Sequence, residues 1–225
     1  MPLLIAALLP ANIYLAQRLL PAGWLPPVPG DEPVLSHPTY RAMCEEYAEL
    51  NRRLAGRRVV VFIGDSITRR FALDEYFPGR GLINRGIFSD TTVGLWQRLG
   101  TSLGGLQIDK LFIMIGHNDL GRRSNQEIVA NIKRIVERAP ARRVYLQSIL
   151  PVSAAPGPVN RRNARIRQIN QALRKMCATG RCHYVDLYRH FQAPGGWLAP
   201  GLSYDGVHPN FRGYQLWSEV VAPLL

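Results

Sequence analysis

The sequence predicts an α/β fold in which a parallel sheet is covered by helices on both faces. Apolar runs of strand length alternate along the chain with longer amphipathic stretches of helical period. One run, Val59–Ile63, holds five consecutive apolar residues, most of them β-branched, as expected for a strand buried on both faces. The length of 225 residues suits one domain with a sizeable core.

Five strands and five helices follow from this alternation. The expected strands cover Arg58–Ile63, Leu82–Asn84, Lys110–Ile115, Arg143–Ile149 and His183–Leu187. The expected helices cover Pro38–Ala55, Thr91–Leu103, Asn125–Arg138, Asn160–Cys177 and Asn210–Val221. Because parallel strands end at one edge of the sheet, the loops that follow them are where we expect a site.

The first strand runs into a tight turn at Gly64-Asp65-Ser66. Gly64 permits the sharp bend, and Ser66 would then begin the next helix with its hydroxyl at the sheet edge. A serine there can attack a carbonyl, and its backbone N–H can hold the oxyanion that forms. Alternatively, Asp65 or Ser66 only caps the helix.

Three further segments favour the catalytic interpretation. They are Ile83–Gly86, Phe112–Asp119 and Tyr204–Asn210. Together with Gly64-Asp65-Ser66 they resemble, in order, the four blocks of the GDSL, or SGNH, hydrolase family, and the resemblance runs from about residue 57 to residue 225. It implies a flavodoxin-like, three-layer αβα fold with a five-stranded parallel sheet, and the activity of a serine esterase that works through an acyl-enzyme.

The resemblance implies a catalytic triad. Ser66 is the expected nucleophile, His208 the general base, and Asp205 the carboxylate that orients the histidine. A serine hydroxyl needs a base to take its proton, and imidazole titrates close enough to neutral pH to do so. The three-residue spacing lets one short loop supply both Asp205 and His208. Taken alone, His208-Pro209 would be an ordinary helix start.

The same resemblance implies an oxyanion hole formed by the backbone N–H groups of Ser66 and Gly86 and by the side-chain amide of Asn118. Taken alone, Gly86 and Asn118 would be ordinary turn residues. His117 stands where the family usually has threonine, and it is a candidate for substrate contact. Asp65, just before Ser66, and Arg69, three residues after it, are two further candidates, and the adjacent Arg70 could also favour anionic substrates.

Other catalytic motifs are absent from the sequence. It contains no Gly-x-Ser-x-Gly elbow, no His-Glu-x-x-His zinc motif, no zinc-finger spacing and no phosphate-binding Gly-Lys loop. We therefore expect neither a metal nor a cofactor.

The formal net charge is +12, and arginine pairs recur along the chain. A basic surface of this kind can attract an anionic polymer or a membrane surface, or it can simply be solvated. No nucleic-acid-binding signature accompanies the charge, so we expect no specific nucleic-acid partner.

Residues 1–36 are expected to form an apolar N-terminal segment and a proline-rich linker before a single hydrolase domain at 37–225. The apolar part could be an export signal, a membrane-associated helix, or an extension that completes the fold or an oligomer contact. Cys177 and Cys182 could form a short disulfide or remain free thiols, with Cys44 unpaired. A bridge would indicate an oxidising compartment, and we favour an exported or membrane-associated protein over a cytoplasmic one.

The expected substrate is a small-molecule, glycan or lipid ester. A compact chain without a large lid insertion favours a short acyl group, such as acetyl on a carbohydrate. The alternatives are a lysophospholipase or thioesterase, an acyltransferase to a sugar hydroxyl, and a non-enzymatic polymer-binding protein.

Overall fold

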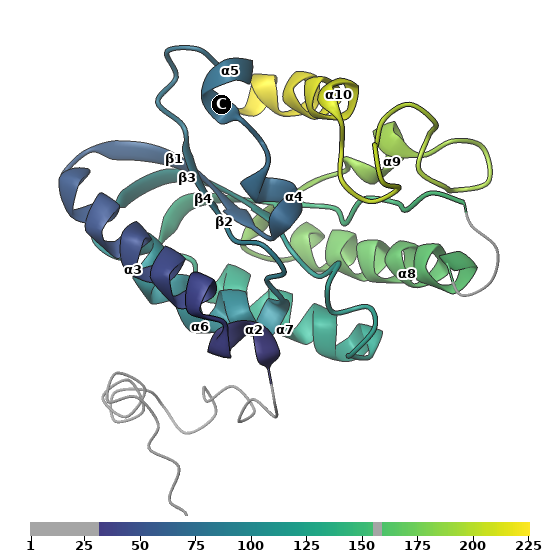
Figure 1. The fold of residues 1–225 in the computed structure, drawn as a ribbon, viewed down its shortest axis with the longest axis horizontal. Coiled ribbons are helices and arrows are strands. Elements are labelled where there is room, and N and C mark those ends of the chain that lie inside the picture. The colour runs from purple at the N-terminus through teal and green to yellow at the C-terminus, as the bar shows by residue number, and fades with distance from the viewer. Residues whose placement is uncertain (1–31, 155–158) are drawn as a thin grey trace, which may run out of the picture. The chain divides into compact units, whose positions relative to one another are not determined.

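The computed structural model describes residues 32–154 and 159–225, which contain a central five-stranded sheet (Figure 1). The strands are β1 (Arg58–Gly64), β2 (Ile83–Gly86), β3 (Gln107–Met114), β4 (Ala141–Gln147) and β5 (Cys182–Val185). They lie in the order β2-β1-β3-β4-β5, and every neighbouring pair is parallel. This is the flavodoxin-like order, whose ligand site lies beyond the carboxyl ends of β1 and β3. The predicted fold class is confirmed.

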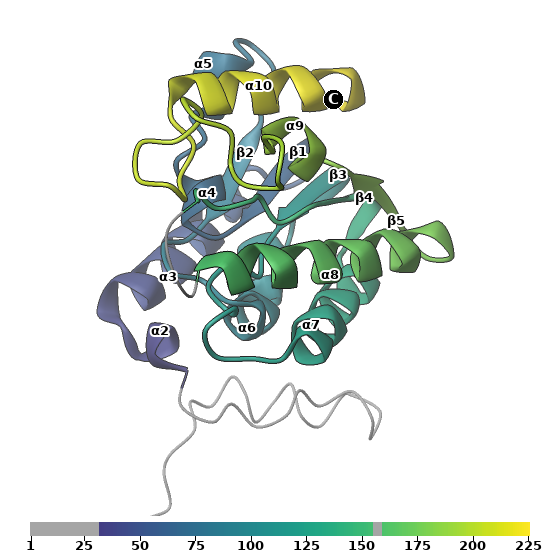
Figure 2. The same cartoon turned by 90° about the vertical axis from the view of Figure 1, so that its right-hand side faces the viewer.

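Helices cover both faces of the sheet, as Figure 1 and Figure 2 show from two directions. One layer contains α3 (Pro38–Arg53), α6 (Thr92–Leu103), α7 (Asn125–Arg138) and α8 (Val159–Ala178). The other contains α10 (Phe211–Val221) and three single-turn helices, α4 (Ser66–Arg69), α5 (Leu73–Tyr76) and α9 (Tyr188–Phe191). The single turns were not predicted, because four residues are too few to display a helical period.

The two faces of the sheet are packed with different side chains. The core towards α6, α7 and α8 is mostly isoleucine, leucine and valine. The core towards α10 is rich in aromatic rings, and Phe62 and Phe112 stack there with centroids 4.5 Å apart. The buried Trp217 of α10 donates its indole N–H to Gln147 at 2.6 Å, which fixes α10 to the end of β4.

Two helices begin one residue later than the sequence suggested, because the predicted first residue is the cap. Thr91 accepts a hydrogen bond from the N–H of Gly94 at the start of α6, and Asn210 accepts one from Gly213 at the start of α10. A side-chain oxygen at this position satisfies a backbone donor that the first helical turn leaves free. Both caps lie in loops that reach the carboxyl edge of the sheet.

Pro33–Leu225 forms one compact unit. It includes α2 (Pro33–Ser36), which packs against α3, although the expected linker extended to residue 36. The predicted apolar segment lies almost entirely in residues 1–31, outside the described residues. Among the residues described, no helix is both long and apolar enough to cross a membrane.

The cysteines are arranged as one bridge and one free thiol. Cys177, near the end of α8, forms a disulfide with Cys182, at the start of β5. Cys44 is a free thiol on α3, and burial raises its pKa to about 11. Of the two alternatives that the sequence left open for this cysteine pair, the structure shows the disulfide.

Candidate active site

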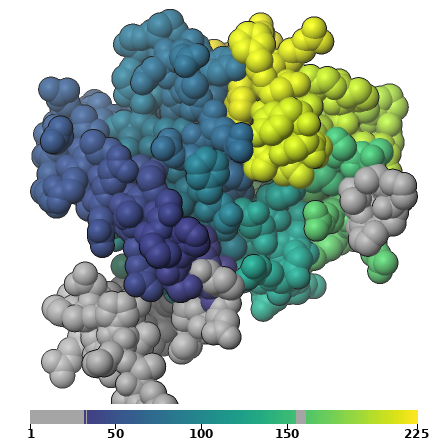
Figure 3. Space-filling view, in the orientation of Figure 1, coloured from purple at the N-terminus to yellow at the C-terminus, as the bar shows by residue number. Residues whose placement is uncertain are grey.

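Segments far apart in the sequence meet at the carboxyl edge of the sheet. Figure 3 shows the C-terminal segment, in yellow, lying against the segment that follows β1, in blue. Tyr214 of α10 donates its hydroxyl to the carbonyl of Ile67 in α4 at 2.7 Å, a buried hydrogen bond between residues 147 positions apart. This contact fixes α10, and the loop before it, beside the turn that carries Ser66.

Ser66 is the first residue of α4 and is separated from the end of β1 by Asp65 alone. Its backbone N–H has no hydrogen-bond partner within the described parts of the chain, as is normal for the first turn of a helix. The turn is held by Asp65, whose Oδ1 accepts the N–H of Ile67 at 2.9 Å. Ser66 is half-buried, so its hydroxyl remains open to a substrate.

The expectation that Asp65 contacts substrate is wrong. Asp65 is buried, with 1% of its surface exposed, and it serves as the helix cap. Its Oδ2 is buried and has no hydrogen-bond partner among the described residues. Burial raises the pKa of this carboxyl to about 7, because a charged oxygen there would lose its hydration without compensation.

Ser66, His208 and Asp205 form a continuous chain of hydrogen bonds. Ser66 Oγ lies 2.9 Å from His208 Nε2, although the two residues are 142 positions apart. His208 Nδ1 lies 2.6 Å from Asp205 Oδ2. Because a carboxylate can only accept, Nδ1 carries the proton and Nε2 is left to accept the serine hydroxyl. The structure therefore brings these three predicted residues together.

The loop that presents His208 is organised by its own side chains. Asp205 Oδ1 accepts the N–H groups of Val207 at 2.9 Å and of His208 at 2.7 Å. Ser203 donates its hydroxyl to the carbonyl of His208 at 2.7 Å. Desolvation acts to raise the pKa of Asp205, but the hydrogen bonds from His208 and Val207 outweigh it and hold that pKa at about 2. The carboxylate is thus charged at neutral pH.

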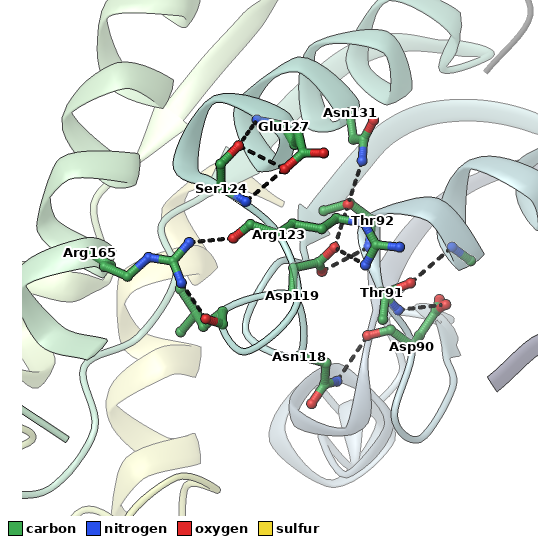
Figure 4. A network of polar contacts seen from close by, with 12 residues as sticks. Asp90, Thr91, Thr92, Asn118, Asp119, Arg123, Ser124, Glu127, Asn131 and Arg165 are labelled. Atoms are coloured by element: carbon green, nitrogen blue, oxygen red, sulfur yellow. Dashed lines mark hydrogen bonds and ion pairs between the residues drawn. The ribbon is translucent and has the colours of Figure 1, made fainter. Parts of the chain in front are cut away.

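Asn118 lies on the other side of the site, beyond the end of β3. Its side-chain N–H₂ donates to the carbonyl of Asp90 at 2.9 Å, which leaves its second N–H available (Figure 4). The preceding turn is made possible by Gly116, whose φ of 118° lies in the region that favours glycine. A Cβ there would also lie 2.9 Å from Ile149 Cδ1.

Gly86 does not fill the predicted donor role. It is buried in β2, and its N–H already donates to Asn84 Oδ1 at 2.8 Å. Glycine is needed here for packing, because a Cβ would lie 2.3 Å from the backbone nitrogen of Arg69. Gly86 therefore lets α4 approach β2, and it does not offer an N–H to a substrate.

Ser89, three residues further along the chain, has the properties expected of Gly86. It is exposed, its φ is 60°, and no partner for its N–H is found in the described structure. The next residue, Asp90, is the one whose carbonyl Asn118 binds, so the Ser89–Asp90 peptide lies beside Asn118. Ser89 is not predictable from the sequence, because nothing in the neighbouring residues marks a serine that adopts a positive φ.

Buried ionic groups hold this side of the site. Asp90 Oδ2 accepts Arg98 Nε at 2.7 Å, and Arg98 also donates to the carbonyls of Gly64 and Arg85 at 3.0 and 2.9 Å. Asp119 accepts the backbone N–H of Thr92 at 3.0 Å and its hydroxyl at 2.6 Å (Figure 4). These groups tie the ends of β1 and β2 and the start of α6 into one framework.

His117 lies near the triad but is not hydrogen-bonded to it. Its Nδ1 is buried and has no partner in the parts of the chain described. Burial, together with the positive charge of Arg162 and the neighbouring His208, lowers the pKa of His117 to about 4. The imidazole is therefore neutral at physiological pH.

Two arginines follow Ser66, and they point to different neighbours. The charge of Arg69 acts on Tyr47 of α3, where it opposes the rise in the tyrosine's pKa that burial causes. The guanidinium of Arg70 lies 5.7 Å from the ring centroid of Phe88 and 5.4 Å from that of Tyr204. Arg70 therefore borders the loops on either side of Ser66, and a substrate contact by Arg69 stays a prediction.

Comparisons with known proteins identify the family of this chain. The GDSL-like Lipase/Acylhydrolase family matches residues 62–216. Human "Platelet-activating factor acetylhydrolase IB subunit alpha1" is 30% identical over 165 residues, which cover 69% of this chain and 70% of the relative.

Solved structures share the fold. A GDSL-like lipase from Bacteroides thetaiotaomicron has a TM-score of 0.73 at 24% identity, over 80% of this chain and 96% of that one. An acetylxylan esterase from Geobacillus stearothermophilus has a TM-score of 0.61 at 19% identity, over 75% and 94%. The family match covers more than half of the sequence and includes every member of the Ser66–His208–Asp205 chain. The chain therefore belongs to the GDSL-like lipase/acylhydrolase family and is an esterase-type hydrolase.

Proposed function

We propose that the protein hydrolyses short-acyl esters, in particular acetyl esters of carbohydrates, through an acyl-enzyme on Ser66. The observation that carries this proposal is the hydrogen-bonded chain Ser66–His208–Asp205. His208 Nε2 takes the hydroxyl proton while Ser66 Oγ attacks the ester carbonyl. The charged Asp205 stabilises the imidazolium that results. His208 then gives the proton to the departing alcohol and activates water to release the acid.

The oxyanion would be held by the N–H groups of Ser66 and Ser89 and by the free N–H of Asn118. Each of these donors is without another partner in the described structure or has a hydrogen to spare. Donors of this kind act on the charge that develops in the transition state, and removing one typically costs about 10²–10³ in kcat. Ser89 replaces Gly86 in the set expected from the sequence.

Two considerations support a short acyl group and a carbohydrate. The human relative is named an acetylhydrolase, and the Geobacillus structure is an acetylxylan esterase. In addition, Tyr204 is 55% exposed beside His208, where an aromatic face can stack on an apolar or sugar ring.

The test is hydrolysis of 4-nitrophenyl esters from acetyl to palmitoyl by the wild type and by Ser66→Ala. We expect turnover that requires Ser66 and falls steeply beyond butyryl. A preference for long chains would instead favour a lysophospholipase or thioesterase. Loss of ester without release of free acid, when sugar acceptors are present, would favour acyl transfer. Absence of Ser66-dependent turnover on every ester would reject the proposal.

A further inference from the structure

Arg70 is held at the mouth of the site by two aromatic rings from different loops. Phe88 comes from the loop between β2 and α6, and Tyr204 from the loop that carries His208. The two rings are 51% and 55% exposed, so they leave large apolar faces open to solvent. Among the described residues, only two other large hydrophobic side chains, Leu50 and Phe211, are comparably exposed.

The guanidinium of Arg70 has no carboxylate partner in the described structure. Asp205 follows Tyr204 in its loop, and its two oxygens accept hydrogen bonds from Val207 and His208. An arginine that contacts aromatic rings through its face keeps its N–H edge free to bind an anion through two hydrogen bonds. The guanidinium of Arg70 is therefore free to bind an anion from a substrate.

The position of Arg70 places its guanidinium near the alcohol portion of a bound ester. The backbone N–H of Arg70 binds the carbonyl of Ser66 at 3.1 Å, so Arg70 lies one helical turn from the nucleophile. The ring of Tyr204 lies nearly parallel to that of His208, at 13° and with centroids 6.1 Å apart. Since His208 gives its proton to the departing alcohol, this side of Ser66 is the side where the alcohol leaves.

We propose that Arg70, Phe88 and Tyr204 form a subsite for an anionic group, a carboxylate or a phosphate, on the alcohol portion of the ester. The aromatic faces contact the alcohol, and the guanidinium binds its charge. The positive charge of Arg162, which also acts on the neighbouring His117, adds to the attraction. This inference rests on the proposed esterase function and gives it a substrate class.

The experiment compares three acetylated sugars that share one ring and one acetylated hydroxyl: glucose, glucuronic acid and glucose 6-phosphate. Acetate release gives kcat/KM for the wild type, Arg70→Gln and Arg53→Gln. Arg53 is an exposed arginine at the far end of α3 and is the matched control for a lost surface charge.

We expect the wild type to favour at least one of the two anionic sugars by roughly tenfold, as a charged hydrogen bond provides. Arg70→Gln should abolish this preference and leave the neutral sugar within about twofold, while Arg53→Gln keeps it. Whether the glucuronic acid or the phosphate arm is favoured identifies the anion. A wild type without preference, a preference that survives Arg70→Gln, or an equal loss on all three sugars would overturn the subsite.

Binding to Ser66→Ala separates this inference from the proposed function. Titration of the intact acetylated sugars, followed by ligand NMR, should show tighter binding of the favoured anionic sugar and loss of that difference in Ser66→Ala/Arg70→Gln. If binding discriminates but no ester is cleaved by the wild type, the subsite stands and the esterase proposal fails. If esters are cleaved but binding does not discriminate, the subsite fails alone.

Discussion

The two sides of Ser66 are built in opposite ways. On one side, His208 stands on a partly exposed loop held mostly by hydrogen bonds between Ser203 and His208, with one longer link from the N–H of Ser153 to the carbonyl of Gly206 at 2.9 Å. On the other, Asn118 and the peptide after Ser89 rest on buried charges that join the ends of β1 and β2 and the start of α6. Proton transfer therefore depends on a locally stabilised loop, and oxyanion binding on the packed interior.

This difference predicts that substitutions on the His208 side lower activity without lowering stability. Substitutions on the Asn118 side should lower both. An exposed loop can lose a side chain with little effect on the free energy of unfolding. A buried ion pair cannot lose one partner in that way, because the other charge remains without compensation.

The largest effect is expected for His208→Ala. Loss of the base should lower kcat for 4-nitrophenyl acetate by about 10⁴–10⁶-fold, while the free energy of unfolding changes by less than about 1 kcal/mol. His190→Ala, an exposed histidine on α9, is the matched control and should retain activity. A His208→Ala enzyme that keeps a few per cent of wild-type kcat would show that another group acts as the base.

Arg98→Met should be the most destabilising substitution. It leaves the carboxylate of Asp90 buried without its cation, and we expect a loss of about 3–5 kcal/mol in urea denaturation. Arg98→Met/Asp90→Asn should recover part of that loss, because the uncompensated charge is gone. Arg53→Met, on the surface, should change stability by less than about 0.5 kcal/mol. Equal stability of both arginine variants would refute the framework.

Asn118→Ala should affect both properties, each to a smaller degree. Loss of an oxyanion donor should lower kcat by about 10²–10³-fold with little change in KM. Loss of the hydrogen bond to the carbonyl of Asp90 should cost about 1 kcal/mol. Steady-state kinetics and urea denaturation of the same preparation provide both values. A rise in KM alone would mean that Asn118 binds substrate but does not stabilise the transition state.

The smallest effects concern pH. Asp65 has a raised pKa of about 7, so between about pH 4 and pH 7 the folded chain binds a proton that the unfolded chain has lost. Its contribution to stability therefore falls as pH rises through that range. Asp65→Asn should gain thermal stability relative to the wild type as pH rises from 4 to 7. A difference in Tm that is constant with pH would contradict the raised pKa.

His117 should show the opposite sign. With a pKa of about 4 it stays neutral in the folded chain, while in the unfolded chain it takes up a proton below about pH 6.5. Its contribution to stability is therefore lost as pH falls from about 6.5 to 4. His117→Thr should gain Tm relative to the wild type only towards acid pH. The pH–rate profile above pH 5 should be unchanged, because His117 does not titrate there.

The sequence predicts the sheet well because each buried parallel strand corresponds to a run of apolar residues. It also predicts Ser66, Asp205 and His208, because each stands in a short block of fixed spacing. The order of the strands is not contained in any apolar run; the family resemblance implied it, and the sheet has that order, with β1 between β2 and β3.

The oxyanion side was harder to predict. The family resemblance implied Gly86 as a donor, but its N–H is bound to Asn84, and the absence of a side chain there serves packing. From the sequence alone, Arg98 would be expected on the surface because it is charged. In the structure α6 packs against the sheet, and only 3% of the surface of Arg98 is exposed. A buried charge and a left-handed serine are products of the tertiary fold, so local patterns do not reveal them.

The hydrogen bond between Ser66 and His208 joins residues 142 positions apart, so the recovery of activity during refolding reports when these distant segments meet. Contacts so distant along the chain close a large loop and tend to form late. A chain that has formed its sheet but has not docked α10 would show helical and strand circular dichroism without turnover. The delay between the recovery of the circular dichroism signal and the recovery of esterase activity would therefore measure how long α10 takes to dock.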